Sequence, residues 1–148
     1  MRPRPVPILV ADDSEDDVLL LREAFAEARL ANSLHVVRDG EAALAWLRRE
    51  GDYRGALRPG LVILDINMPK KDGFQVLREI KRDPTLAHLP VVMLTTSQRE
   101  EDVVRSYREG AASFLCKPAE FQRYPELVGK FAAYWATVAR LPSGWMED

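Results

Sequence analysis

Five short, largely apolar runs recur along this chain, each about four residues long. They are residues 8–11, 34–37, 61–64, 91–94 and 113–116. Uninterrupted apolar runs of this length are typical of strands that are buried on both faces, as in a parallel sheet. The pattern therefore predicts five buried, parallel strands.

Between these runs lie stretches in which apolar residues recur with helical spacing. The predicted helices begin near Ser14, Gly40, Phe74, Gln98 and Phe121, and the last reaches about Ala139. Strands that alternate with helices over short links favour a right-handed, doubly wound α/β fold with helices on both faces. We expect a flavodoxin-like, five-stranded parallel sheet with the strand order 2-1-3-4-5.

Acidic residues crowd the start of the first predicted helix. Ser14, or Asp13 itself, is predicted to cap this helix. Glu15, Asp16 and Asp17 place negative charge where the helix dipole favours it. The pattern alone gives these last three acids a structural role.

The length and composition suit one globular domain. The chain has 148 residues and a formal net charge of -2, with no basic stripe that would indicate nucleic-acid binding. We expect one domain over residues 1–140 and a short tail over 141–148 without an output domain. No apolar stretch approaches a membrane span, and the proline-rich start does not resemble a signal peptide.

The chain holds one cysteine, Cys116, at the end of the fifth apolar run. A single cysteine excludes an internal disulfide framework and is typical of a reducing cytoplasm. Its place in a predicted strand indicates a buried, small hydrophobic residue. We therefore expect a cytoplasmic protein without disulfides.

Four of the apolar runs end in residues that carry chemistry. The first leads to Asp12 and Asp13, the third to Asp65, the fourth to Thr95 and the fifth to Lys117. The predicted strand order makes the first and third strands neighbours, and ligands of such sheets bind at this end. Two carboxylates about 4 Å apart repel by on the order of 1 to 4 kcal/mol. A cation or a proton must offset such a cluster, although each residue taken alone has an ordinary structural explanation.

Oxygen ligands of this kind suit Mg²⁺, with Mn²⁺ as an alternative. His35 and His88 are isolated, so no zinc-like spacing exists. An incoming phosphoryl group would have its charge offset by the metal and Lys117, and Thr95 could donate a hydrogen bond to it. A carboxylate must be the nucleophile, and Asp65 at the end of the central strand is the best candidate.

These residues resemble the receiver domain of two-component response regulators. The matching motifs are Asp12-Asp13, residues 65–69 with Gly73, Thr95 and Lys117-Pro118. The resemblance covers about residues 6–139, and the combination is specific although each piece is common.

The resemblance implies a role for each matching position. Asp65 would be the phosphoacceptor, and Asp13 and Asp65 would bind the metal directly. The backbone carbonyl of Asn67 would be a third ligand, and Asp12 would act through a metal-bound water.

The resemblance also implies a conformational switch. Lys117 would pair with Asp65 at rest and with a phosphoryl oxygen afterwards. Thr95 would move to the phosphoryl group, and Phe114 stands where the family has a switch aromatic residue. Receiver domains often have a cis peptide bond before this proline, so Lys117-Pro118 is a candidate for one, and the sequence leaves its isomer open.

Three stretches, residues 16–21, 35–40 and 134–142, resemble stand-alone regulators that are partnered with phytochrome-type histidine kinases. The expected partner is therefore a sensor histidine kinase. It would dock near the first helix and the loop after Lys117. No nucleic acid or membrane partner is expected.

Aromatic residues in the last helix exceed what one sheet-facing stripe requires. They favour a homodimer through the fourth and fifth helices and the last strand, with harmless exposed aromatics as the alternative. The candidate contacts are Tyr107, Phe131, Tyr134 and Trp135.

Three other functions compete with this interpretation. A haloacid dehalogenase-type phosphatase requires an acid two residues after the nucleophile, where this chain has Asn67. A flavin phosphate would be repelled by the acidic residues after the first strand. A degenerate receiver that only binds partners remains the alternative. We expect no enzyme activity beyond self-phosphorylation and autodephosphorylation.

Overall fold

The computed structural model describes residues 5–136 and 141. The strands are β1 (Ile8–Ala11), β2 (Leu34–Val37), β3 (Leu61–Leu64), β4 (Val91–Thr95) and β5 (Ser113–Cys116). The helices are α1 (Glu15–Glu27), α2 (Gly40–Arg48), α3 (Gly73–Arg82), α4 (Glu100–Arg108) and α5 (Tyr124–Phe131). Short 3-10 turns cover Gly51–Tyr53 and Phe121–Arg123, and a π-helical turn covers Ala132–Ala136.

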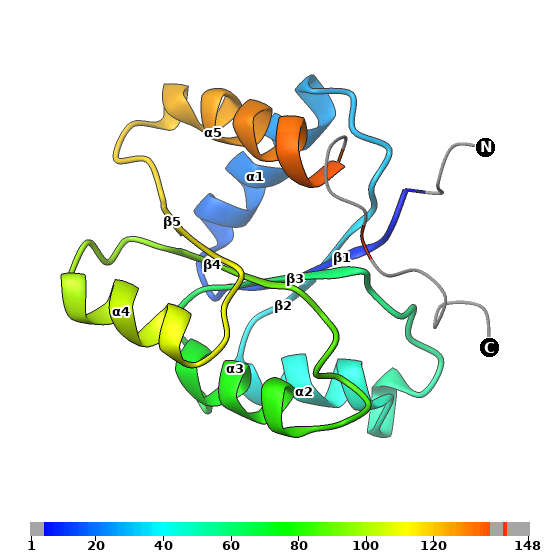
Figure 1. Ribbon diagram of the computed structural model, residues 1–148. Helices are drawn as coiled ribbons and strands as arrows, with labels where there is room; N and C mark the ends of the chain where they lie inside the picture. The colour runs from blue at the N-terminus through cyan, green and yellow to red at the C-terminus, as the bar shows by residue number, and fades with distance from the viewer. Residues whose placement is uncertain (1–4, 137–140, 142–148) are drawn as a thin grey trace.

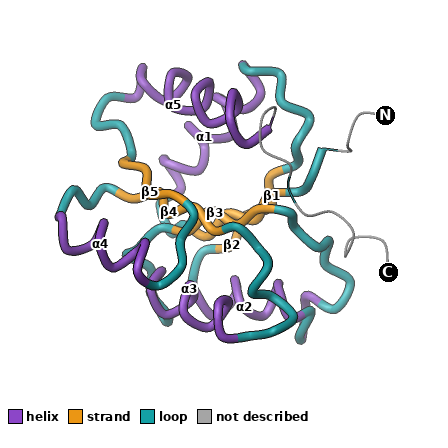
Figure 2. The backbone as a smooth tube through the Cα atoms, in the orientation of Figure 1, coloured by secondary structure: helices purple, strands orange, loops and turns teal. Residues whose placement is uncertain are grey.

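All five strands are parallel and lie in the order β2-β1-β3-β4-β5, which confirms the predicted fold. Helices α1 and α5 cover one face of the sheet, and α2, α3 and α4 lie on the other (Figure 1). The same three layers are visible when the backbone is coloured by secondary structure (Figure 2). The first and third strands are neighbours, so the switch point lies where the sequence predicted it.

The core is divided by the sheet into two apolar clusters. In β1, Leu9 and Ala11 face α2 and α3, whereas Ile8 and Val10 face α1 and α5. This alternation is the two-residue period of a strand with both faces covered. The central strands β1, β3 and β4 are buried along their whole length.

The edge strands differ from the prediction of strands buried on both faces. β5 is only partly buried, and Cys116 is exposed, so its predicted burial is wrong. An edge strand has a neighbour on one side only, which leaves its last residue accessible. The next residue, Lys117, is the buried one.

Helix ends follow from local side-chain bonding. Ser14 caps α1 by accepting a hydrogen bond of 3.3 Å from the backbone N–H of Asp17. Asp72 and Gln75 form a reciprocal capping box at the start of α3. Gly110 follows α4 with a φ of +106°, as expected for a residue just beyond a helix end.

Three predictions fall partly outside the described residues. They concern the end of the last helix beyond residue 136, the domain boundary at residue 140 with most of the tail, and the first four residues. Leu141 is described, and it packs against the α1–α5 side of the core. In the described part of the chain, none of the helices has both the length and the apolar character needed to cross a membrane.

Candidate functional site

Three carboxylates meet at the carboxyl end of the sheet. Asp12 follows β1 and Asp65 follows β3, and the parallel register pairs Ala11 with Leu64 directly before them. The backbone N–H of Asp65 donates a hydrogen bond of 3.0 Å to the carbonyl of Ala11, which fixes the two strand ends together. One carboxylate oxygen each from Asp12, Asp13 and Asp65 lies within 4.8 Å of the others. The predicted acidic pocket is therefore formed.

The ammonium group of Lys117 lies among carboxylates. Its Nζ atom is 2.8 Å from Oδ2 of Asp12, 2.8 Å from Oδ2 of Asp65 and 2.9 Å from Oδ2 of Asp17. An ammonium group has three N–H donors, so these contacts use all of them. Burial lowers the pKa of Lys117, but the hydrogen bonds to the carboxylates outweigh burial and raise it above its ordinary value.

The carboxylates around Lys117 differ in their surroundings. Burial raises the pKa of Asp12, and the hydrogen bonds from Lys117 and the Ser14 backbone only partly offset this effect. Burial also acts to raise the pKa of Asp17, but there the hydrogen bond and the charge of Lys117 prevail and the pKa is lowered. Asp13 is exposed, so the pocket opens to solvent on its side.

Asp17 is a member of this site that the sequence analysis missed. Its Oδ2 atom accepts from Lys117, and its Oδ1 atom accepts a hydrogen bond of 3.0 Å from the hydroxyl of Tyr124. Tyr124 is the first residue of α5 and is 2% exposed. No local signal separates Asp17 from its acidic neighbours in the first turn of α1, because its two partners come from the end of β5 and the start of α5.

The donor set fits a divalent cation. It consists of carboxylate oxygens that are partly buried and crowded, which is the chemistry that Mg²⁺ and Mn²⁺ prefer. One lysine is shared by Asp12, Asp17 and Asp65, and Asp13 adds a further negative charge, so negative charge exceeds positive charge among these groups. Asn67 lies in the exposed loop between β3 and α3, two residues beyond Asp65. A bound cation would relieve the repulsion among these groups.

Thr95 and Phe114 lie on neighbouring strands. Thr95 ends β4 and is fully buried, and its Oγ1 atom accepts a hydrogen bond of 3.3 Å from the backbone N–H of Ser97. The backbone N–H of Lys117 donates to the Thr95 carbonyl at 2.7 Å, so the residue is tied to the lysine through the main chain. Phe114 is partly buried against the α2–α3 side of the core. No peptide bond in the described residues is cis, so the Lys117–Pro118 bond, whose isomer the sequence left open, is trans.

The dimer candidates divide into exposed and buried residues. Tyr107 and Tyr134 are about half exposed, and the hydroxyl of Tyr107 accepts a hydrogen bond of 3.1 Å from the backbone N–H of Phe114 on the open edge of the sheet. Phe131 is 7% exposed and packs against Phe25, so most of its ring belongs to the core. Trp135 is partly buried and contacts Tyr134 edge to face.

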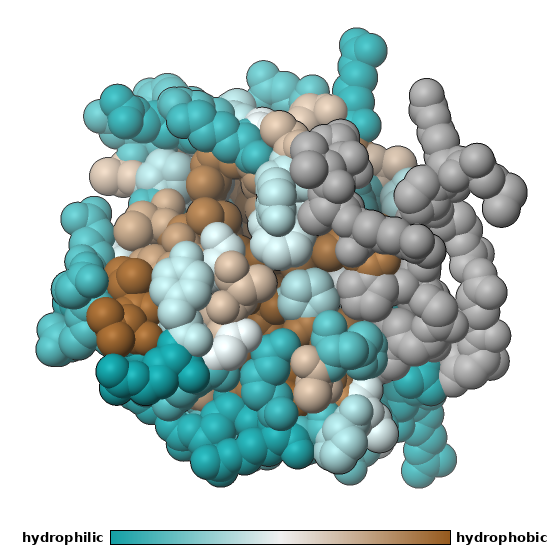
Figure 3. All heavy atoms as spheres, in the orientation of Figure 1, coloured by the Kyte–Doolittle hydropathy of each residue, from teal (hydrophilic) through white to brown (hydrophobic). Residues whose placement is uncertain are grey.

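A shallow groove of about 260 Å³ runs between β5 and α5. Apolar side chains, drawn in brown, reach the surface between α5 and β5 and near α4 (Figure 3). The groove is lined by Ser113, Leu115, Leu127, Lys130, Phe131, Tyr134 and Trp135. The face formed by α4, β5 and α5 thus exposes aromatic and apolar side chains from several elements.

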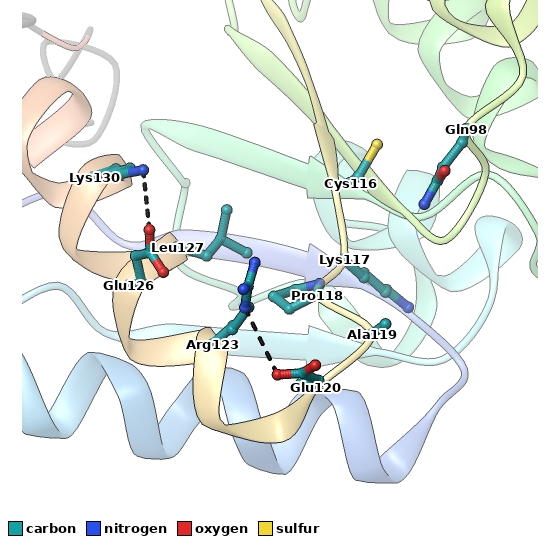
Figure 4. Close-up of a pocket in the computed structure, with 10 residues that line it drawn as sticks. All are labelled: Gln98, Cys116, Lys117, Pro118, Ala119, Glu120, Arg123, Glu126, Leu127 and Lys130. Carbon is teal, nitrogen blue, oxygen red and sulfur yellow. Dashed lines mark hydrogen bonds and ion pairs between the residues drawn. The ribbon is translucent and has the colours of Figure 1, made fainter.

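A second, larger pocket of about 460 Å³ lies beside the acidic site, between the end of β5 and α5. Figure 4 shows Cys116 and Lys117 pointing in different directions from the end of β5, with Cys116 on the side of Gln98. Two ion pairs, Arg123 with Glu120 and Lys130 with Glu126, lie along the α5 side of this pocket. Its mixed charges give it no preference for one kind of ion.

Comparisons with known proteins agree with this geometry. Residues 8–128 match the family described as the response regulator receiver domain. The chain is similar to response regulator Rcp1 of Synechocystis sp., with 39% identity over 139 residues that cover 94% of this chain and 95% of the relative.

Two solved structures are also similar over nearly their whole length. The phosphorylated cyanobacterial phytochrome response regulator RcpA has 41% identity and a TM-score of 0.89, over 94% of this chain and 99% of the other. The Mn²⁺-bound form of response regulator Rcp1 has 39% identity and a TM-score of 0.88, over 94% and 100%. The second similarity agrees with a divalent cation at the acidic pocket described above.

Proposed function

Because the chain belongs to the response regulator receiver domain family, we propose that it is a single-domain response regulator that accepts a phosphoryl group on Asp65. The observation that carries this proposal is the contact of 2.8 Å between Lys117 Nζ and Asp65 Oδ2, inside a pocket that also holds Asp12 and Asp13. This arrangement supports the proposal, because it brings a carboxylate, a buried lysine ammonium group and further carboxylates within a few ångströms.

Asp65 is the acceptor in this proposal. One of its carboxylate oxygens forms a bond to phosphorus as the bond between phosphorus and the imidazole nitrogen of a kinase phosphohistidine breaks, and the imidazole leaves. A Mg²⁺ or Mn²⁺ ion held by Asp12, Asp13 and Asp65, with the Asn67 carbonyl as a further ligand, would offset the charge of the phosphoryl group.

Lys117 and Thr95 supply the remaining stabilisation. Lys117 already donates a hydrogen bond to Asp65. After phosphorylation the same N–H group would donate to a phosphoryl oxygen instead of the carboxylate. Thr95 gives up its weak contact of 3.3 Å with the Ser97 backbone to donate its hydroxyl to the phosphoryl group. Phe114 then turns inward beside it, so that the change at Asp65 reaches the surface of β5.

The protein acts on itself and not on an external substrate. Neither the matching receiver family nor the relative Rcp1, which aligns over 95% of its length, includes a catalytic output domain. We propose that its activity is limited to taking up the phosphoryl group and losing it by autodephosphorylation, and that contacts with other proteins carry the signal.

The proposed phosphodonor is a sensor histidine kinase of the phytochrome type. RcpA is described as a cyanobacterial phytochrome response regulator, and it is similar to this chain over nearly its full length. Leu19, which is 55% exposed on α1, and the loop after Lys117 are the proposed docking surface. Phosphotransfer from a purified kinase of this type should be slower in Leu19→Glu, whereas a small phosphodonor should modify this variant normally.

The proposed homodimer uses the face formed by α4, β5 and α5. Exposed Tyr107 and Tyr134, partly buried Trp135 and the outer edge of Phe131 supply its apolar contacts. Because Tyr107 bonds to the Phe114 backbone, a movement of Phe114 would alter this face. Dimerisation would thereby respond to phosphorylation.

Intact-mass spectrometry after incubation with acetyl phosphate and Mg²⁺ tests the central proposal. We expect one phosphoryl adduct that is absent without the metal and absent in Asp65→Asn. The exposed Asp52→Asn variant is the matched control and should be modified like the native protein. A folded protein that takes up no phosphoryl group would instead be a degenerate receiver that only binds partners.

A further inference from the structure

Asp17 differs from the other carboxylates that contact Lys117. Asp12 and Asp65 belong to the trio whose oxygens lie within 4.8 Å of one another, and Asp17 does not. All three accept from the lysine at nearly equal distances, 2.8 to 2.9 Å. Lys117 is therefore shared between two acids that belong to the predicted cation site and one acid that lies outside it.

Asp17 is held in place from both sides of its carboxylate. Tyr124 donates to Oδ1 at 3.0 Å, and Lys117 donates to Oδ2 at 2.9 Å. Its backbone N–H is bonded to the side chain of Ser14 at the start of α1. A carboxylate fixed in this way is a preorganised acceptor, because little rotamer freedom remains to be lost when it binds the ammonium group.

A divalent cation and Lys117 compete for the same carboxylates. Oδ2 of Asp12 and Oδ2 of Asp65 each contact the lysine, and the Oδ1 atom of Asp12 already accepts from the backbone N–H of Ser14. A cation that binds Asp12 and Asp65 draws negative charge away from the lysine and so weakens the bonds of these carboxylates to Lys117. Asp17 is the acceptor that can keep the ammonium group when this happens.

We propose that Asp17, fixed by Tyr124, is a positioning residue that draws Lys117 away from Asp12 and Asp65 and thereby strengthens binding of a divalent cation at the acidic pocket. This inference rests on the proposed function, since it concerns the metal of the same site. It also links the cation site to α5, because the hydroxyl that fixes Asp17 comes from the first residue of that helix. Without Asp17, both remaining acceptors of the lysine are carboxylates of the cation site.

The experiment is a calorimetric titration of the metal-free full chain with Mn²⁺. Asp17→Asn should bind Mn²⁺ about fivefold or more weakly than the native protein. Asp16→Asn is the matched control, because it removes the same charge from the same turn of α1 at an exposed position. It should change the affinity by less than about twofold.

A double-mutant cycle separates the role of Lys117 from a general loss of negative charge. In a Lys117→Met background there is no lysine to share, so Asp17→Asn should then change the Mn²⁺ affinity no more than Asp16→Asn does. An equal loss in both backgrounds, or an equal loss in Asp17→Asn and Asp16→Asn, would overturn the proposal.

Salt dependence gives the same answer if Lys117→Met fails to fold. A long-range charge effect of Asp17 is screened as the ionic strength rises, whereas direct sharing of a buried lysine is not. The affinity ratio between native protein and Asp17→Asn should persist in high salt, and its disappearance would overturn the proposal.

Failure of this inference is distinguishable from failure of the proposed function. If the native protein and Asp17→Asn bind Mn²⁺ equally, only the role of Asp17 is lost. If the native protein binds no Mn²⁺, the metal site itself is wrong and the inference falls with it. Absence of a phosphoryl adduct with normal Mn²⁺ binding would remove the phosphoacceptor role and leave the lysine-sharing role intact.

Discussion

The ammonium nitrogen of Lys117 lies 2.8 Å from the Oδ2 atom of Asp65, although 52 residues separate the two in the chain. The lysine side chain is 3% exposed and the aspartate side chain is 9% exposed. A buried cation of this kind is compatible with the fold only because carboxylates surround it, and the carboxylates in turn depend on the cation. The contact between Lys117 and Asp65 thus contributes both to the stability of the metal-free protein and to the chemistry of the site.

Lys117→Met should lower the free energy of unfolding by about 3 kcal/mol, because it leaves the buried carboxylates of Asp12 and Asp65 without their cation. Saturating Mg²⁺ should restore part of this loss, since a ligand that binds only the folded state stabilises it. Urea unfolding with and without the metal measures both effects.

Lys130→Met is the control for this variant. Lys130 is 78% exposed and pairs with Glu126 on the surface of α5, so its loss should cost less than about 1 kcal/mol. Equal costs for the two lysines would contradict the dependence of the acidic pocket on Lys117.

Gly73 is packed against the backbone that carries the acceptor aspartate. A Cβ atom at this position would contact the Asp65 carbonyl oxygen and would lie 2.9 Å from the Cα atom of Ile66. We expect Gly73→Ala to destabilise the fold by about 1 to 3 kcal/mol and to slow phosphorylation, because the strand end must shift. Thermal unfolding and the rate of adduct formation measure the two effects.

Gly129→Ala is the matched control for Gly73→Ala, and we expect it to have the opposite effect on stability. Gly129 lies inside α5, and nothing lies within 4 Å of an added Cβ atom. This variant should be more stable by about 0.5 to 1 kcal/mol and should be phosphorylated normally. A Gly73→Ala protein that behaves like Gly129→Ala would show that the contact with Asp65 has no consequence.

The hydroxyl of Tyr124 should make stability decline at alkaline pH. Burial and the neighbouring Asp17 carboxylate raise the pKa of Tyr124. A raised pKa means that the fold favours the neutral hydroxyl. Its contribution is present below about pH 10, where the unfolded side chain is also neutral, and is lost as the pH rises further.

Tyr124→Phe should therefore show a shallower decline of unfolding free energy between about pH 8 and about pH 11. At the lower pH it should be less stable by about 1 to 2 kcal/mol, through loss of the bond to Asp17. Lys117 contributes a decline in the same direction in both proteins, so the difference between them isolates the tyrosine. Parallel curves for the native protein and the variant would refute this assignment.

The sequence predicted the sheet and the pocket because both depend on features of short segments. The apolar runs locate the central strands, and the residue after each run lies at the carboxyl end of the sheet. Once the first and third strands are neighbours, Asp12 and Asp65 must be close. The alternation of strand and helix predicts a doubly wound parallel sheet, and the order 2-1-3-4-5 is one of the two common orders of such sheets.

Features that depend on packing between distant segments were not predictable in this way. Asp17 has the same local setting as Asp16, and only the approach of α5 and Lys117 distinguishes the two. Cys116 has the apolar neighbours of a buried strand residue, but it ends an edge strand and is exposed. Leu19 lies in an apolar stretch of the first helix, yet Val18 and Leu21 are buried and Leu19 is exposed to solvent.

Tyr134 is the residue at which the proposed dimer can be tested with least damage to the fold. It is 53% exposed at the edge of the groove between β5 and α5, whereas Phe131 and Trp135 also pack against the core. In a two-fold dimer the same apolar surface of each copy faces its partner. A charge introduced there is therefore present on both copies, and both charges lose their hydration when the dimer forms. Tyr134→Glu should therefore be monomeric in light scattering at a concentration where the native protein is dimeric. Leu57→Glu, at a comparably exposed leucine near the 3-10 turn that follows α2, should leave the dimer intact, and a dimeric Tyr134→Glu protein would exclude this face.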